Sequence, residues 1–247
     1  MFREIAKIKA IFRYPVKSMA GESLESARLG WHGLEGDRRF ALHRVGNESG
    51  FPWLTAGRLP QLLQYRPVNR NANGADDLPT HVIAPDGREL ELRGEELQRE
   101  LSAAFGSPVQ MMRLDQGIFD EAKVSVISAA TIQAIGQAIE PETGSELDVR
   151  RFRPNLLIET LSGEPFAEDA WVGKILRFQD HAEAAGLNVS MRDLRCAMIN
   201  FDPVTGVSDP KVLKTVTRLN NTDAGLYASV VGVGTLSVGD RIFLQDI

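Results

Sequence analysis

The sequence has few of the residues and motifs that identify common enzyme classes. Its 247 residues include one cysteine, Cys196, and four histidines in unrelated contexts. No intramolecular disulfide can form, and the histidines lack zinc-ligand spacing. Neither a glycine-rich phosphate loop ending in Lys-Ser or Lys-Thr nor a serine nucleophile elbow occurs. Disulfide scaffolds, common zinc enzymes, P-loop hydrolases and α/β-hydrolases are therefore excluded.

Long apolar runs are also missing. Residues 1–19 alternate basic and apolar positions without the apolar core of a signal peptide. The most apolar stretch, residues 227–238, is short, β-branched and interrupted by glycines. With a single thiol, which fits a reducing compartment, these patterns predict a cytoplasmic protein that does not associate with membranes.

The chain has fewer basic than acidic residues. Its 28 Lys and Arg and 33 Asp and Glu give a net charge of −5. An acidic molecule repels a phosphate polymer, and aromatic residues make up 7% of the chain. Nucleic acid is therefore not an expected partner, and single-strand binding on the arginine clusters is the weakest alternative. With 43% hydrophobic and 25% charged residues, the composition is typical of a globular protein with a full-sized core.

Hydrophobic patterning indicates mostly short strands. In the first half, leucines and a phenylalanine spaced by four residues predict a helix over 94–106 that stops at a glycine. In the second half, residues 124–139 predict a strand followed by a helix capped by Ser128. A second helix is expected over 209–219. Strands are expected over 5–14, 23–30, 38–44, 80–85, 89–93, 108–114, 151–159, 173–179, 187–191, 196–202, 226–238 and 241–245. The fold class is thus a β-rich α+β protein with two β-barrels and a few short helices, rather than a doubly wound sheet.

Cys196 is the first candidate for chemistry. It follows Arg195 directly, and in an extended chain the two side chains point to opposite faces. A nearby guanidinium favours the thiolate, which is the form that attacks or binds metal. The alternative is a buried cysteine that packs as a small apolar residue.

Arginines form the second candidate. Arg151, Arg153 and Asn155 alternate along an expected strand, so they share a face and could converge on one anion. The alternative is a basic sheet edge that blocks strand pairing. Arg38 and Arg39 begin another expected strand.

Lys17 and Ser18 follow a Tyr14-Pro15 turn, where such a pair can hold a phosphate or simply belong to a solvated loop. Separate cationic clusters and one thiol in an acidic chain suggest a phosphate-bearing cofactor whose reactive centre takes a soft ligand.

Five motifs, in this order along the chain, carry a family resemblance. They are YPVKS at 14–18, GDRRF at 36–40, FRPN at 152–155, RC at 195–196 and DPVTG at 202–206. Together they resemble MOSC proteins that carry a MOSC N-terminal β-barrel, among them the mitochondrial amidoxime reducing components and bacterial proteins that detoxify N-hydroxylated bases. The resemblance implies an N-terminal β-barrel domain over residues 1–115 and a MOSC domain over residues 116–247.

The resemblance also implies a molybdenum cofactor. Cys196 falls at the position of the metal ligand and catalytic thiolate, and Arg195 lies beside it. Lys17, Ser18 and Arg39 fall where the cofactor phosphate and pterin are held. Two further cofactor contacts are implied at Arg153 and Asn155. Asp169 is implied as a residue that shapes the substrate side, although Asp169 and Trp171 could equally be structural.

The implied activity is the reduction of small N-hydroxylated compounds such as amidoximes, hydroxylamines and hydroxylated bases. The sequence holds no second thiol for an iron–sulfur cluster, so electrons are expected from a separate electron-transfer protein or reductase. The relatives usually have a small residue just before the arginine and often a second cysteine earlier, giving C-x-R-C, whereas residues 193–196 read Asp-Leu-Arg-Cys here, with Leu194 at the place of the small residue. The alternative is a non-catalytic cofactor carrier or a sulfur relay through a Cys196 persulfide.

Overall fold

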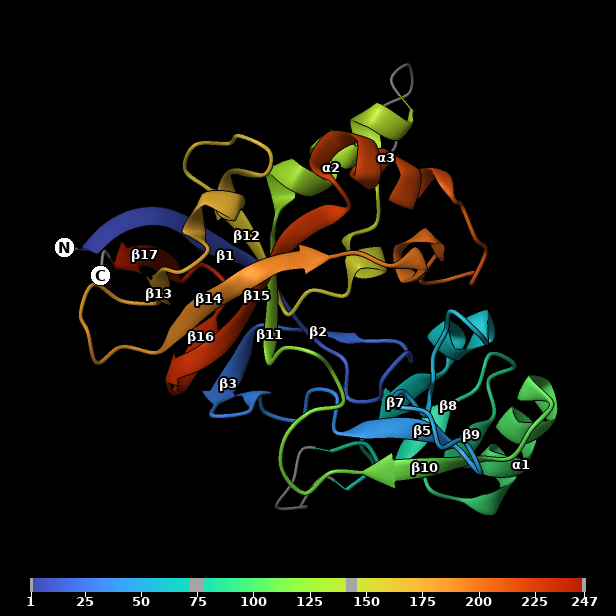
Figure 1. Cartoon of the computed structure of the whole chain (residues 1–247). Coiled ribbons are helices and arrows are strands. Elements are labelled where there is room, and N and C mark those ends of the chain that lie inside the picture. Colours follow the sequence, from blue (N-terminus) through green and yellow to red (C-terminus); the bar gives the residue numbers. More distant parts are fainter. Residues whose placement is uncertain (1, 72–77, 141–145, 246–247) are drawn as a thin grey trace.

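A closed barrel of seven strands forms one half of the molecule (Figure 1). The structure is a computed structural model that describes residues 2–71, 78–140 and 146–245. The barrel strands are neighbours in the order β12, β11, β15, β14, β13, β17 and β1, and pairing of β12 with β1 closes the ring. Their bounds are β1 (Phe2–Arg13), β11 (Val124–Ser128), β12 (Leu156–Thr160), β13 (Ile175–Arg177), β14 (Gly186–Leu194), β15 (Asp223–Gly232) and β17 (Arg241–Gln245). A short strand, β2 (Glu22–Leu24), extends the sheet from β1.

Alternation of apolar side chains builds the barrel core. Ile8 and Ile11 of β1 are buried and lie opposite Ile158 and Leu156 of β12. Ile8 and Ile11 are three residues apart, and a register shift between Ile8 and Ala10 brings both into the same core cluster as Ile158 and Leu156. Among the described barrel strands only β11 and β12 pair in parallel, and α2 (Ala129–Ile139) supplies the crossover between them.

Strand β1 brings the amino-terminal segment into the same barrel as strands from the second half of the chain. It pairs with β12 on one side and with β17 on the other. Both ends of the described chain therefore lie at the same side of the molecule (Figure 1). The domain boundary expected between residues 115 and 116 stays a prediction, with β1 on the far side of it from the other barrel strands.

The second half of the molecule is a smaller β unit with its own core. Its strands form two sheets of three, β10 (Val109–Arg113), β5 (Phe40–Arg44) and β6 (Trp53–Leu54), and β7 (Arg66–Val68), β8 (His81–Ile83) and β9 (Glu89–Glu91). The helix α1 (Glu95–Phe105) buries Leu97 and Leu101 against these sheets, and Gly106 ends it in the left-handed conformation. A further sheet of β16 (Gly234–Ser237), β3 (Ser26–Gly30) and β4 (Gly33–Leu34) pairs a late strand with early ones.

A third apolar cluster lies outside the barrel, where α2 packs on α3 (Lys211–Asn220). The Ser128 hydroxyl accepts a hydrogen bond from the Thr131 backbone N–H at 3.1 Å, so the predicted cap of α2 is confirmed. Phe152 is buried in this cluster. The short 3-10 helices of the chain are η1 (Pro60–Gln64), η2 (Val149–Phe152), η3 (Ala167–Trp171) and η4 (Ala197–Asn200).

The predicted fold class, β-rich α+β with few short helices, is confirmed. One expected strand, 151–159, is wrong at its start, and another, 196–202, is not a strand. Residues 151–153 belong to η2 and its left-handed end, because Asp148 caps this turn and Phe152 is buried. Residues 197–200 form η4, where the Asn200 side chain accepts from the Leu213 backbone N–H of α3. Arg151, Arg153 and Asn155 therefore do not alternate on one strand.

None of the helices in the described part of the chain has the length and apolarity needed to span a bilayer.

Gly225 in β15 gives a direct test of barrel packing. Its φ is +84°, and a Cβ there would lie 2.6 Å from the Val126 carbonyl oxygen. Gly46 has a similar φ of +77° with no atom within 4 Å of such a Cβ. We expect Gly46→Ala to cost about 1 kcal/mol from backbone strain alone, and Gly225→Ala about 3 kcal/mol because overpacking adds to it. Denaturant unfolding of both variants measures the difference, and equal losses would contradict the packing described here.

Candidate functional site

A cavity of about 940 Å³ lies between the barrel and the smaller unit. Lys17, Ser18 and Arg38 line it from the first half of the chain. Arg195 and Cys196 line it from the segment that follows β14. The fold therefore brings together groups that are far apart in sequence, and most of the sequence-predicted site residues are among them.

Cys196 stands exposed on the cavity wall at the start of η4. The preceding Arg195 is buried and also lines the cavity. Its Nε donates to the Ala224 carbonyl at 2.7 Å and its Nη1 to the Phe152 carbonyl at 2.8 Å. These bonds fix the backbone that presents the thiol, and the interpretation of Cys196 as a buried apolar residue does not apply.

Lys17 and Arg38 share one carboxylate, that of Asp120. Arg38 Nε lies 2.5 Å and Lys17 Nζ 3.5 Å from the Asp120 carboxylate. Arg38 also pairs with the buried Asp37, and this pairing with Asp120 and Asp37 outweighs burial and raises the Arg38 pKa. Burial lowers the pKa of Lys17, with Asp120 opposing the shift. Burial acts to raise the pKa of Asp120, but Arg38 and Lys17 hold it below its ordinary value. Asp120 therefore stays ionised at neutral pH, where it pairs with both basic side chains.

Arg153 carries the least compensated charge at the cavity. Its backbone is left-handed, with a φ of 49°, and its guanidinium lies 4.2 Å from the centre of the Tyr14 ring. Nη1 donates to the Met19 carbonyl at 2.8 Å, whereas the buried Nη2 has no hydrogen-bond partner among the described residues. Burial lowers the pKa of Arg153 to about 10. A buried donor of this kind costs free energy unless an acceptor meets it, so the site fits an anionic ligand.

Ser18 also lines the cavity, in a left-handed backbone conformation with a φ of 69°. Such a conformation is uncommon outside glycine and is often found at functional sites. Apolar side chains form another part of the wall: Phe51, Trp53 and Phe119 from the smaller unit, and Leu194 and Met198 beside the cysteine. The cavity thus combines cations, one thiol and an apolar wall.

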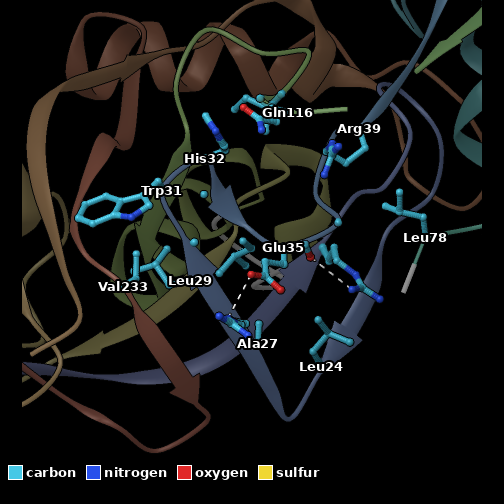
Figure 2. A pocket seen from close by; sticks show the side chains of 18 of the residues that line it. Leu24, Ala27, Leu29, Trp31, His32, Glu35, Arg39, Leu78, Gln116 and Val233 are labelled. Atoms are coloured by element: carbon cyan, nitrogen blue, oxygen red, sulfur yellow. Dashed lines mark hydrogen bonds and ion pairs between the residues drawn. The ribbon is translucent and has the colours of Figure 1, made fainter. Parts of the chain in front are cut away.

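Three sequence-predicted residues lie elsewhere. Arg39 lines a second cavity, of about 660 Å³, together with Trp31 and Gln116 (Figure 2). Its guanidinium donates to the backbone carbonyls of Leu114 and Asp115. The Arg39 side chain therefore fixes the segment that follows β10.

Asn155 is buried and is not among the residues that line the cavity. Its Oδ1 accepts from the Ser125 backbone N–H at 3.0 Å and from Arg38 at 3.4 Å. Its Nδ2 donates to the Phe12 carbonyl at 3.3 Å. Asn155 therefore lies behind the cavity wall, where it orients Arg38.

Asp169 lies in η3, outside the residues that line the cavity. Its Oδ2 accepts from the Asn220 side chain at 2.8 Å and faces Arg192 at 3.5 Å. Trp171, at the end of the same turn, belongs to the barrel core. The predicted role of Asp169 on the substrate side stays a prediction.

Sequence reasoning named Arg38 only as part of a cationic pair with Arg39, and it missed three cavity residues, Asp120, Asp193 and Tyr227. The GDRRF motif contains Arg38 and Arg39, but the motif alone does not show which side chain points into this cavity. The left-handed backbone at Arg38, with a φ of 45°, accompanies the inward side chain. Asp120 lies in an irregular segment without a recognisable pattern, so only its three-dimensional neighbours identify it.

The fold and site define a two-unit β protein with an exposed thiol in a cation-lined cavity. The model of the MOSC N-terminal beta barrel domain matches residues 5–124, and that of the MOSC domain matches residues 103–243. The match to the MOSC domain covers more than half of the chain, so the chain belongs to the MOSC family. The family is associated with the molybdenum cofactor.

Individual relatives are more distant. The chain is 24% identical to mitochondrial amidoxime reducing component 2 of Bos taurus, over 98% of this chain and 84% of that protein. It is 23% identical to mitochondrial amidoxime-reducing component 1 of Mus musculus, over 98% and 83%. It is 26% identical to a molybdenum cofactor sulfurase of Oryza sativa subsp. japonica, over 81% of this chain but 29% of that protein. Among solved structures, the YuaD protein from Bacillus subtilis superimposes with a TM-score of 0.51 at 13% identity over the whole of both chains, which supports the fold.

A substitution of Asn155 tests its structural role. We expect Asn155→Ala to destabilise the cofactor-free protein by about 3 kcal/mol, because several buried partners lose their hydrogen bonds. Asn47→Ala, in an exposed turn where the side chain accepts from Ser49, should cost less than about 0.5 kcal/mol. Unfolding in denaturant measures both. Unchanged stability of Asn155→Ala would count against the contacts described above and for a direct role in ligand binding.

Proposed function

We propose that this protein is a molybdenum-cofactor-binding oxidoreductase that reduces small N-hydroxylated compounds with electrons from a separate electron-transfer protein. One observation carries the proposal: the exposed Cys196 thiol shares a cavity with the Arg153 guanidinium, whose Nη2 has no partner among the described residues. Molybdenum takes soft sulfur ligands, and the Cys196 thiolate is one. The phosphate of the pterin takes charged hydrogen-bond donors, and the Arg153 guanidinium has one without a partner among the described residues.

The residues fit this cofactor in distinct roles. Cys196 would supply the thiolate to molybdenum, with Arg195 fixing the backbone behind it. Lys17, Ser18 and Arg153 would hold the phosphate and pterin by charge-assisted hydrogen bonds. Arg38 keeps this cluster in place through Asp120, and Asn155 and Arg39 support it from outside the cavity. The bound cofactor would supply the two-electron redox chemistry, and the protein supplies position and electrostatics.

Substrate class is inferred from the remaining wall and from the relatives. Phe51, Trp53 and Phe119 present apolar and aromatic surface within the same cavity, and such a surface suits a small, flat organic molecule. Two relatives are named as amidoxime reducing components. Amidoximes carry an N–OH group, so we extend N–OH reduction to this chain.

The electron donor, the compartment and the excluded partners follow from the sequence. Cys196 is its single thiol, whereas an iron–sulfur cluster takes several thiolates; a separate donor is therefore part of the proposal. A cytoplasmic location fits the lone thiol, and the net charge of −5 argues against nucleic acid as a partner.

The molybdenum and pterin contents of a Cys196 variant test whether Cys196 is the metal ligand. Cys196→Ser protein, purified from a host that makes the cofactor, should lose at least tenfold in molybdenum and retain most of its pterin, because the cations still hold the phosphate. Elemental mass spectrometry and the fluorescent oxidation product of the pterin measure the two contents. Ser190→Ala, on an exposed position of the preceding strand, serves as the control and should match the native protein. Native protein with neither metal nor pterin would defeat the proposal.

The anion role of Arg153 is tested separately. Loss of a charge-assisted hydrogen bond of about 1.5–3 kcal/mol should lower pterin affinity by about 10- to 100-fold in Arg153→Ala. Pterin retained after dialysis reports this change. Arg28→Ala is the matched control, since Arg28 lies at the second cavity with its side chain 73% exposed. Equal retention by the two variants would argue against a phosphate at Arg153.

A carrier or sulfur relay is the second candidate. The match to a molybdenum cofactor sulfurase and the exposure of Cys196 favour it, since an exposed thiol can accept a persulfide. Mass spectrometry after incubation with a cysteine desulfurase and cysteine should then show one added sulfur on Cys196. A mass that stays unchanged would remove this alternative.

A further inference from the structure

Asp193 is a buried carboxylate in the wall of the cavity, three residues before Cys196. It is 1% exposed and lies near the end of β14. The Ser125 hydroxyl donates to its Oδ2 at 3.1 Å, and Arg195 Nη2 lies 2.8 Å from the same oxygen. The Tyr227 hydroxyl of the adjacent strand β15 hydrogen-bonds to the carboxylate as well. Ser125, Tyr227 and Arg195 all line the cavity too.

The charges around Asp193 leave it able to change protonation state. Burial raises its pKa to about 6, although Arg195 and the hydrogen bonds from Ser125 and Tyr227 oppose the shift, and the negative charge of Asp120 adds to it. Burial and the Asp193 charge raise the pKa of Tyr227 above its ordinary value, so Tyr227 stays protonated. Arg38 also faces Tyr227 and acts in the opposite direction.

Reduction of an N–OH group consumes protons. The balanced reaction is R–NH–OH + 2 e⁻ + 2 H⁺ → R–NH₂ + H₂O, in which the N–O bond breaks, one N–H and one O–H bond form, and nitrogen is reduced. The electron-transfer protein loses the two electrons. A titratable side chain on the cavity wall, within reach of the leaving oxygen, can supply one of these protons.

On the basis of the proposed function, we propose that Asp193 holds a proton and delivers it to the oxygen that leaves as water. Asp120 is unsuited to this role, because Arg38 and Lys17 keep it ionised. Tyr227 is unsuited because it does not release its proton near neutral pH. Glu121 also lines the cavity but is exposed to solvent, so Asp193 is the buried carboxylate of the wall whose environment allows it to gain and lose a proton near neutral pH.

The sign of the pH dependence follows from the donor role. Protonated Asp193 supplies the proton, so turnover should be highest below a pH of about 6 and should fall about tenfold per pH unit above it. Asp193→Asn keeps the shape and can hold a hydrogen bond but cannot donate the proton. We expect it to turn over at least tenfold more slowly at low pH and without this pH dependence.

The experiment uses native protein, Asp193→Asn and Asp223→Asn, each with its molybdenum and pterin content measured. Asp223 is the matched control: its side chain is 13% exposed and pairs with Arg192 at 3.1 Å, but it does not line the cavity. Benzamidoxime is the substrate probe and chemically reduced methyl viologen the electron source. Rates are compared from pH 5 to pH 8 per bound molybdenum. Asp223→Asn should keep the native profile.

A second readout does not depend on turnover. Infrared difference spectra between pH 5 and pH 8 should show a protonated-carboxyl band in native protein and in Asp223→Asn that is lost in Asp193→Asn. Tyr227→Phe removes a hydrogen bond that lowers the pKa of Asp193, so it should move the midpoint of the band to higher pH. If Asp193→Asn fails to fold, the shift of this midpoint in Tyr227→Phe still tests whether Asp193 is the group that titrates.

The outcomes separate the two proposals. Native protein that contains molybdenum and pterin but does not reduce the probe at any pH would overturn the proposed function. Native turnover with an unchanged rate and pH profile in Asp193→Asn would overturn the role of Asp193 and leave the function standing. Absence of the carboxyl band in native protein would also overturn the role of Asp193.

Discussion

A buried guanidinium needs several oxygen acceptors, and Arg38 finds them on three separate segments of the chain. Its neighbour Asp37 supplies one carboxylate and Asp120, from the segment before β11, supplies another. The Arg153 backbone carbonyl accepts from Nη2 at 2.9 Å, at the point where η2 leads into β12. The same residue therefore joins the smaller unit, the connecting segment and the barrel. Removal of any one acceptor would leave a buried charge partly unmet, which costs more than an ordinary lost contact.

This constraint explains why the site is made between the two units and not within either. The barrel presents Arg153 and Cys196 from segments at one of its ends, and the smaller unit presents Lys17 and the aromatic wall. Strand β1 runs from the barrel directly into the turn that carries Lys17, so closure of the barrel also places that lysine. A change in the pairing of β1 with β12 would move both sides of the cavity.

The sequence was sufficient for most of the elements. Alternating apolar residues predict β1, β5 and β17, a spacing of four predicts α1, and Ser128 marks the start of α2, because these signals are local. It was insufficient at residues 151–153 and 197–200. Tertiary contacts decide the conformation there: Phe152 fills an apolar cluster and Asn200 caps the start of α3. These tertiary contacts override the strand preference of the local sequence.

Motifs located the candidate site but did not resolve the roles within it. They pointed to Lys17, Ser18, Arg153, Arg195 and Cys196, all of which line the cavity. They could not distinguish Arg38 from Arg39, since adjacent residues differ in direction only through the backbone, and the left-handed conformation at Arg38 is a tertiary outcome. Asn155 matched a motif, yet it does not line the cavity. A motif therefore includes residues that hold the lining side chains in place as well as residues that line the cavity.

The cavity wall offers a ligand two kinds of contact. Arg153 contributes a buried donor without a partner among the described residues, so an anion bound there relieves an existing cost. Phe51 and Trp53 contribute apolar surface, where a ligand gains by excluding water. An anion bound at Arg153 would therefore be held more tightly than a ligand that touches the apolar surface alone. That asymmetry suits a resident cofactor beside an exchanging substrate, with the Cys196 thiol and the Asp193 carboxylate both on the wall of the cavity that the two share.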